Sequence, residues 1–292
     1  AGVTSAMVFV IAVGAMHSTL SGHAEHLSGW AFGGIGAGIA LSGLVVLILR
    51  SMGTWESVWW AAALLTLICT FAAWTLTPER APMAPTVERR KSPKRKRRWF
   101  SMLFISYSLE GVGYIIAGTF LVAAIDHTAG SVAGSGAWVI VGLAALPSAP
   151  LWALLGRRWS RPILLVTALV VQAAGIALPA VADGIWAALI SAFLFGGTFL
   201  GISQMSLRIG AHLQFPRAVA ILTSGYSLGQ IAGPLVVTPL LSDGYHLALL
   251  VAAGIVLAAA LTATLLASTH MRSVETSRSH SHSRVVGLSK SV

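Results

Sequence analysis

The sequence PERAPMAPTVERRKSPKRKRR occupies residues 78–98, and WFSMLFISYSLEGVGYIIAGTFLVAAI follows it directly as residues 99–125. The first stretch contains nine Lys or Arg residues and four prolines, whereas the second contains Glu110 as its one charged residue. An apolar run of about 20 residues or more can span a bilayer as a helix. The junction therefore predicts a membrane-spanning helix that starts beside a flexible, strongly basic loop.

The composition extends this interpretation to the whole chain. Of the 292 residues, 56% are hydrophobic and 10% are charged, and the mean hydropathy is +0.81. A soluble domain carries about 25% charged residues, so a water-soluble globular fold is excluded. The single cysteine, Cys69, rules out a disulfide framework and any metal site built from several cysteines.

Nine apolar segments are long enough to cross a membrane, and we expect an all-α fold, a polytopic bundle of nine transmembrane helices. They are residues 1–20, 30–49, 55–76, 99–125, 135–155, 162–182, 184–207, 217–241 and 246–268. The predicted organisation is a partial N-terminal bundle of three helices (1–77), a basic linker (78–98), a six-helix bundle (99–269) and a disordered tail (270–292).

The distribution of positive charge predicts the orientation. If the linker is cytoplasmic, alternation places every Lys and Arg except Arg50 on the inner side, and Asp126, Asp183 and Asp243 in outer loops. We therefore expect a multi-pass protein of the inner (plasma) membrane, with the linker and C-terminus in the cytoplasm. The run KSPKRKRRW by itself is typical of nucleic-acid binding, but its position between two membrane spans favours contact with anionic lipid, and no nucleic-acid partner is expected.

The second and eighth segments resemble each other. GWAFGGIGAGIALSGL starts at Gly29 and GYSLGQIAGPLVVTPL starts at Gly225, so that at an offset of 196 residues Gly33 meets Gly229. If the first three segments correspond to the last three, the six helices after the linker form a complete half. We therefore expect the later part of a twelve-helix protein that lacks its first three helices, and an alanine at residue 1 agrees with this.

Two six-helix halves joined by a basic cytoplasmic linker resemble the major facilitator superfamily of secondary transporters. The runs SYSLEGVGYIIAGTFLVAAI from Ser106, HLSGWAFGGIGAGIALSG from His26 and GYSLGQIAGPLV from Gly225 resemble its YbfB/YjiJ branch. The resemblance implies a twelve-helix fold and a transport function. The superfamily's loop motif, G-x3-D-R-x-G-R-R/K, is degenerate in ALLGRRWSRP, which keeps Arg158 and Arg161.

Glu110 is the one carboxylate deep in an apolar segment. It lies about 11 residues into the segment and so about 16 Å from the cytoplasmic surface, where an ionised side chain costs about 2.5 kcal/mol or more. It should face protein or an aqueous cavity, with Tyr107 and Tyr114 on the same helical face. We interpret Glu110 as the proton-coupling residue. The alternative is a buried acid hydrogen-bonded to a neighbouring helix.

Other polar residues at similar depth are candidates for the substrate cavity. We expect the cavity to be lined by Tyr107, Tyr114, Tyr226, Gln230 and Gln204. Gln230 is favoured because it lies between Gly229 and the Gly233-Pro234 pair, where the helical backbone is weakened. For Gln204, and for Gln172 at matching depth, an interhelical hydrogen bond is an equally good interpretation.

A different class of function is suggested by His17, His23, Glu25 and His26, which fall within ten residues and carry ligands that suit zinc. An integral membrane enzyme or metal-handling protein is therefore the alternative hypothesis. No H-E-x-x-H pair and no phosphate-binding glycine loop accompany the cluster. We expect no enzymatic activity, no metal and no cofactor.

Together these patterns predict a secondary active transporter of a small organic solute, coupled to protons and working by alternating access. Its partners are the solute, protons and the lipid bilayer. The sequence does not fix an oligomeric state, and a monomer is the default expectation. A truncated transporter without function is the remaining alternative.

Overall fold

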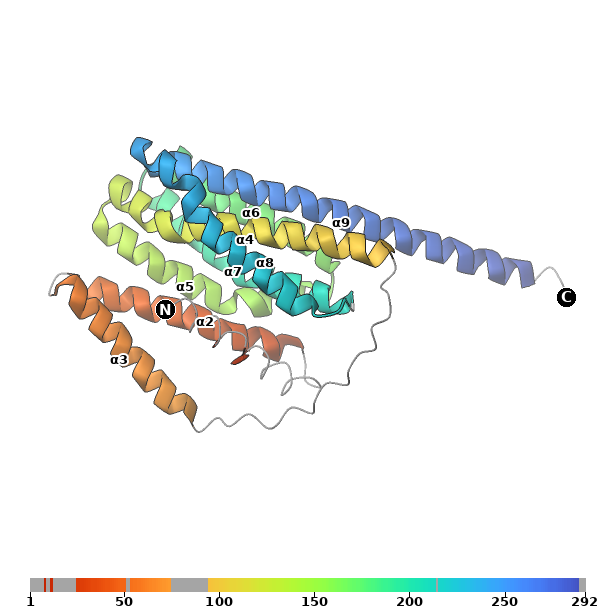
Figure 1. Ribbon diagram of the computed structural model, residues 1–292, viewed down its shortest axis with the longest axis horizontal. Helices are drawn as coiled ribbons and strands as arrows, with labels where there is room; N and C mark the ends of the chain where they lie inside the picture. The colour runs from red at the N-terminus through yellow and green to blue at the C-terminus, as the bar shows by residue number, and fades with distance from the viewer. Residues whose placement is uncertain are drawn as a thin grey trace.

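The computed structural model describes residues 8, 11–12, 25–50, 53–74, 94–213 and 215–288, which are helical apart from short turns. In chain order the elements are α2 (Glu25–Leu49), α3 (Trp55–Trp74), α4 (Lys94–Ala129), α5 (Ser131–Leu155), α6 (Arg161–Val181), α7 (Ile185–His212), α8 (Ala218–Val237), η1 (Thr238–Asp243, a 3-10 helix) and α9 (Tyr245–Leu288) (Figure 1). The all-α class is therefore confirmed for the part of the chain that is described.

Eight helices among the described residues are long and apolar enough to cross a membrane. They coincide with the predicted segments from 30–49 onward, and their ends differ from the predictions by a few residues, as in the candidate span Lys96–His127. The predicted segment 1–20 lies outside the described residues except for positions 8 and 11–12. The count of nine helices therefore stays a prediction.

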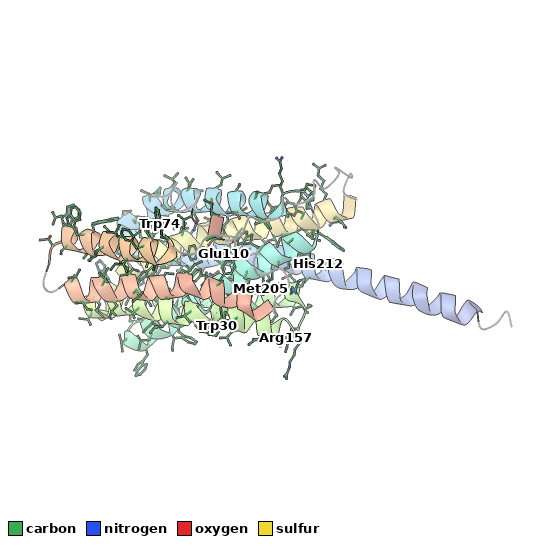
Figure 2. The ribbon with its side chains drawn as sticks, turned by 90° about the horizontal axis from the view of Figure 1, so that it is seen from below. Trp30, Trp74, Glu110, Arg157, Met205 and His212 are labelled. Atoms are coloured by element: carbon green, nitrogen blue, oxygen red, sulfur yellow. The ribbon has the colours of Figure 1, made fainter. Side chains whose placement is uncertain are left out.

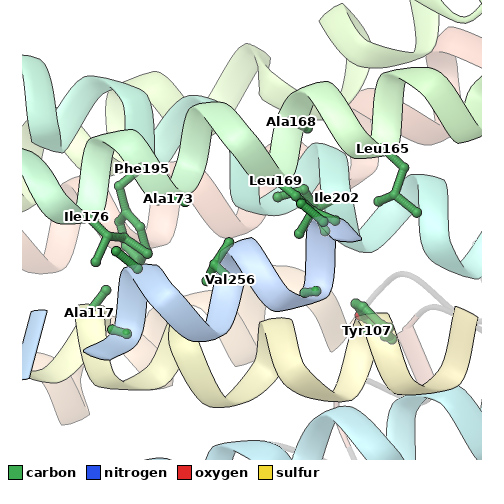
Figure 3. Packing of buried hydrophobic residues seen from close by; sticks show 14 of the residues in the cluster. Tyr107, Ala117, Leu165, Ala168, Leu169, Ala173, Ile176, Phe195, Ile202 and Val256 are labelled. Atoms are coloured by element: carbon green, nitrogen blue, oxygen red, sulfur yellow. The ribbon is translucent and has the colours of Figure 1, made fainter. Parts of the chain in front are cut away.

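Helices α4 to α9 pack into one bundle, in which α9 lies between α4 and α6 (Figure 3). Most buried residues of α9 are alanines, namely Ala248, Ala252, Ala253, Ala259, Ala260, Ala263 and Ala267. Small side chains allow helices in a membrane to approach closely. Ser106 of α4 adds a hydrogen bond across this contact, with its hydroxyl donating to the carbonyl oxygen of Ala259 at 2.8 Å.

Helix α2 packs along α5 through small residues on both helices. A Cβ atom built on Gly33 would lie 2.7 Å from the carbonyl oxygen of Leu146, and one on Gly36 would collide with the Leu146 backbone. On α5, a Cβ on Gly142 would meet the backbone of Ala40. The two backbones are therefore in direct contact, which glycine alone permits at these positions.

Helix α3 lies on the outer side of α2, away from the six-helix bundle (Figure 1). None of its residues is buried by the described part of the chain, and Trp55, Trp60 and Trp74 are more than two-thirds exposed, at 72%, 76% and 76%. An all-round apolar surface of this kind is typical of a helix that faces lipid.

Helices α5 and α7 are joined by polar contacts that converge on one carbonyl group. Ser148 donates its hydroxyl to the carbonyl oxygen of Gly197 at 2.8 Å, and the indole N–H of Trp152 donates to the same oxygen at 2.9 Å. The backbone N–H of Gly201 donates in turn to the Ser148 hydroxyl at 3.2 Å. These bonds lie within the apolar part of both helices, where polar groups need internal partners.

Three boundaries differ from the sequence-based expectations. Helix α4 begins at Lys94, so the last residues of the predicted linker belong to its first turns. Helix α9 continues to Leu288 and includes most of the segment expected to form a tail from residue 270. Helix α8 ends at Val237 and η1 follows, because Pro239 in the first turn of η1 has no N–H to continue the α-helical ladder.

Candidate functional site

Glu110 is completely buried in the six-helix bundle, with no exposed surface. It lies near the middle of the candidate span Lys96–His127 and about half-way along the bundle (Figure 2). Its Oε1 accepts a hydrogen bond from Nε2 of Gln172 on α6 at 3.3 Å. Gln172 is also fully buried and lies near the middle of the span Arg161–Val181. The two side chains therefore meet at mid-depth between α4 and α6.

The same pair contains two buried oxygen atoms without a hydrogen-bond partner, Oε2 of Glu110 and Oε1 of Gln172. A carboxylate accepts hydrogen bonds at both oxygens, and an unpartnered polar atom costs about 1–3 kcal/mol when it is removed from water. The pair is therefore the site in the described bundle at which the protonation state of a buried carboxyl group has to be explained.

Three tyrosines form an aromatic cluster beside Glu110. The rings of Tyr107 and Tyr226 stack with centroids 4.6 Å apart, and the ring of Tyr114 lies 6.1 Å from that of Tyr226. Tyr114 also stacks on Phe199 and Phe195 of α7, at 5.2 Å and 5.6 Å. All three phenols are within electrostatic range of the Glu110 carboxyl group.

The hydroxyl of Ser203 on α7 lies close to the phenols of both Tyr107 and Tyr226. The cluster therefore joins α4, α7 and α8 through ring stacking, with one hydroxyl group beside two of the phenols. Stacked aromatic rings of this kind are worth about 0.5–1.5 kcal/mol beyond their buried area.

Glycines explain why α8 comes close enough to α4 to place Tyr226 in the cluster. A Cβ on Gly111 would lie 2.6 Å from the carbonyl oxygen of Tyr226. A Cβ on Gly229 would collide with the carbonyl oxygen of Ser108, and one on Gly233 with the side chain of Ile115. Gly229 and Gly233, which the sequence suggested as a weak point of the helix, therefore serve close packing between α4 and α8.

The remaining candidates lie on the helices that carry the cluster. Gln230 is partly buried one turn after Tyr226 on α8. Gln204 follows Ser203 on α7 and is 3% exposed, and its Nε2 has no hydrogen-bond partner. Gln230 and Gln204 are thus on the right elements for a cavity lining, which stays a prediction for both.

The structure brings together Tyr107, Glu110, Tyr114 and Tyr226 and adds two residues that the prediction did not include in the cavity, Gln172 and Ser203. Gln172 had a signal in the sequence, because it is an amide at the same depth as Glu110 in another span. Ser203 had none, since serine is common in membrane helices. The hydrogen bond between Gln172 and Glu110 is the contact expected from the alternative interpretation, in which Glu110 is a buried acid bonded to a neighbouring helix. It is also compatible with proton binding, because Oε2 of Glu110 is unpartnered.

The suggested metal cluster falls at the start of the described part of the chain, and it stays a prediction. His17 and His23 lie outside the described residues, and Glu25 and His26 form the start of α2. Within the described residues, no group of three or more His, Cys, Asp or Glu side chains is arranged to hold a metal ion.

Comparison with protein families gives a match over most of the chain. The family described as "Uncharacterised MFS-type transporter YbfB" matches residues 1–264, nearly the whole chain, and this confirms the resemblance seen in the sequence. No curated protein matches the chain.

Proposed function

Because the chain belongs to the family of YbfB-like MFS-type transporters, we propose that it is a secondary active transporter of a small organic solute, driven by protons and working by alternating access. It is a multi-pass membrane protein, and its lipid bilayer and solute partners follow from the family. The choice of the proton as coupling ion, the residues involved and the orientation are our proposals.

The observation that carries proton coupling is Glu110. It is a fully buried acid at mid-span, with one oxygen bonded to Gln172 and the other unpartnered. Acidic side chains inside a membrane are costly and usually mark proton or substrate pathways. A carboxyl group that is neutral when buried and ionises when water reaches it would change its charge between two facing states.

The aromatic cluster supports an organic solute as the cargo. Tyr107, Tyr114 and Tyr226 offer ring faces for apolar contact and hydroxyl groups for orientation, which is the usual composition of a small-molecule site. Gln230 and Gln204 would add amide donors and acceptors on α8 and α7. We propose that these five side chains line the solute pathway when the transporter opens.

We further infer the overall arrangement from the repeat between residues 29–44 and 225–240. In this proposal α2 and α3 belong to the first half of a twelve-helix fold and α4 to α9 form the second half. The linker and C-terminus lie in the cytoplasm and the protein resides in the inner membrane, as the distribution of Lys and Arg favours. The oligomeric state is not assigned, with a monomer as the default expectation, and no nucleic-acid partner is proposed.

Replacement of Glu110 by Gln tests the coupling. The full chain is reconstituted in liposomes with a trapped pH-sensitive dye, and a panel of small organic anions, cations and neutral solutes is screened for solute-dependent proton movement. We expect Glu110→Gln to keep the fold, because Gln is close in size, and to abolish solute-dependent proton flux and uptake driven by a pH gradient.

Glu56→Gln is the matched control, since Glu56 is an exposed acid in the first turn of α3. It should leave both measurements unchanged. Gradient-driven uptake that persists in Glu110→Gln at the level of Glu56→Gln would remove Glu110 from the coupling mechanism.

A further inference from the structure

The unpartnered atoms of the Glu110–Gln172 pair are both hydrogen-bond acceptors. Gln172 already donates from Nε2 to Oε1 of Glu110 at 3.3 Å, which leaves Oε2 of the acid and Oε1 of the amide without a donor. Both residues have no exposed surface. Two acceptors in a fully buried position are unfavourable unless a proton lies between them, because each loses its hydrogen bond to water.

The surroundings do not compensate a negative charge at this position. The titratable groups facing Glu110 among the described residues are the phenols of Tyr107 and Tyr114 on α4 and Tyr226 on α8. Next to Gln172 on α6, Leu169 and Ala173 are buried apolar residues. On α9, which packs against both helices, the buried residues are alanines and larger aliphatic residues.

The cations on the same helices are far away along the chain. Arg98 of α4 precedes Glu110 by 12 residues, and Arg161 of α6 precedes Gln172 by 11 residues. At 1.5 Å per residue these separations are about 16–18 Å. A buried ion without a close counter-ion costs several kcal/mol, which favours the neutral acid in this conformation.

A neutral carboxylic acid satisfies both unpartnered atoms at once. An acid and a carboxamide have complementary edges: the amide N–H donates to the acid carbonyl, and the acid O–H donates to the amide carbonyl. The first of these bonds is present between Nε2 and Oε1. The second would form when Oε2 carries a proton.

We propose that Gln172 is the second half of the proton-binding site, a positioning residue that accepts the proton of Glu110 at its own Oε1 and thereby ties α6 to α4 while the proton is bound. This rests on the proposed function in that it takes Glu110 as the proton-binding group. Binding converts the carboxylate to the acid and adds one hydrogen bond across the two helices. Release breaks that bond and leaves a charge that requires water, so the contact between α4 and α6 has to open.

The pair can be tested by infrared spectroscopy, which detects the C=O stretch of a protonated carboxyl group directly. The full chain is purified in an alkyl maltoside detergent, which has no carbonyl group of its own. We expect the difference between wild type and Glu110→Gln at neutral pH to show one protonated-acid band, and this band should shift to lower wavenumber in D₂O.

Gln172→Met tests the partner. It removes both hydrogen bonds while keeping a similar side-chain volume, and the acid band should therefore shift to higher wavenumber. Glu110→Asp provides the same readout if Gln172→Met does not fold, because the shorter acid is withdrawn from the amide by one methylene group. Ser191→Ala is the matched control. Ser191 is fully buried and its hydroxyl donates to the Gly175 carbonyl of α6 at 2.6 Å, so the substitution removes a hydrogen bond to α6 without touching the pair.

The outcomes separate this inference from the transport proposal. Absence of a Glu110-dependent acid band at neutral pH, or a band that Gln172→Met or Glu110→Asp leaves at the wild-type position, would overturn the pairing even if Glu110→Gln abolishes transport. A band that shifts as expected, together with unchanged gradient-driven transport in Glu110→Gln, would support the pair and reject Glu110 as the coupling residue.

Discussion

Gly111 is the residue at which the backbone of α4 meets the carbonyl oxygen of Tyr226, since a Cβ there would lie 2.6 Å from that atom. Backbone atoms of a helix cannot move away without shifting the whole of α8. We therefore expect Gly111→Ala to lower the free energy of unfolding by about 1–3 kcal/mol through overpacking. Thermal unfolding of the purified protein in detergent measures this.

Gly118 provides the control on the same helix, because a Cβ at this position meets nothing within 4 Å. Gly118→Ala should be neutral or stabilising by up to about 1 kcal/mol, since alanine is the better helix former. Equal effects of the two substitutions would contradict the close approach of α4 and α8 at Gly111.

At the level of single residues, the sequence predicts neighbours along one helix better than neighbours across two. Tyr107 and Tyr114 could be placed beside Glu110 because residues three and four positions apart share a helical face. Gln172 could not be selected over Gln204 as its partner. The identity of the partner depends on which face of α6 turns toward α4 beside α9. Hydropathy along the chain does not show which helices are neighbours.

Among the elements, the contact between α2 and α5 is sensitive to side-chain size. Gly36 lies directly against the backbone of Leu146, whereas Gly34 has nothing within 4 Å. We expect Gly36→Leu to separate α2 from α5 and Gly34→Leu to be tolerated. Hydrogen exchange followed by mass spectrometry should show α2 amides exchanging about tenfold faster or more in Gly36→Leu, which corresponds to about 1.4 kcal/mol.

Equal exchange rates in the two variants would argue that α2 is not held on α5 by backbone contact. The comparison is balanced, because both substitutions add the same apolar side chain to the same helix two residues apart. A general effect of leucine on α2 would appear in both variants.

The positions of the membrane helices were largely predictable because apolarity changes abruptly at their ends, as at Arg161, the first residue of α6, and at Asp183 after the helix ends. The end of α8 was not predictable in this way. The change from α-helix to 3-10 helix at Thr238 takes place inside an apolar run, and it depends on the position of Pro239 rather than on hydropathy.

For the whole molecule, the proposed orientation makes the two ends of α6 accessible from opposite sides of the membrane. Ser160 and Asp183 are exposed and flank this helix. In a Cys69→Ser background, a membrane-impermeant maleimide should label Asp183→Cys in intact cells and Ser160→Cys only after the membrane is permeabilised. The reverse pattern would invert the orientation, and with it the assignment of the linker to the cytoplasm.

The sequence predicts the orientation in the membrane only through the unequal numbers of Lys and Arg on the two sides. The helices themselves are apolar in both of their halves and do not distinguish an inner end from an outer end. The repeat at an offset of 196 residues predicts two related halves. How the halves meet depends on contacts such as that between α2 and α5, which are formed by glycines and carry no pattern specific to a partner.

The alanine-rich face of α9 has a mechanical consequence for Glu110. Helices that present large side chains interlock and resist movement along their axes, whereas a smooth alanine surface offers few such obstacles. The Ser106 hydroxyl, bonded to the carbonyl oxygen of Ala259 one helical turn from Glu110, and the side chain of Val256, which lies against Gly113, are two contacts that oppose sliding of α9 along α4. The position of the acid along α9 thus depends on a few contacts, one of which is the hydrogen bond of a single hydroxyl group.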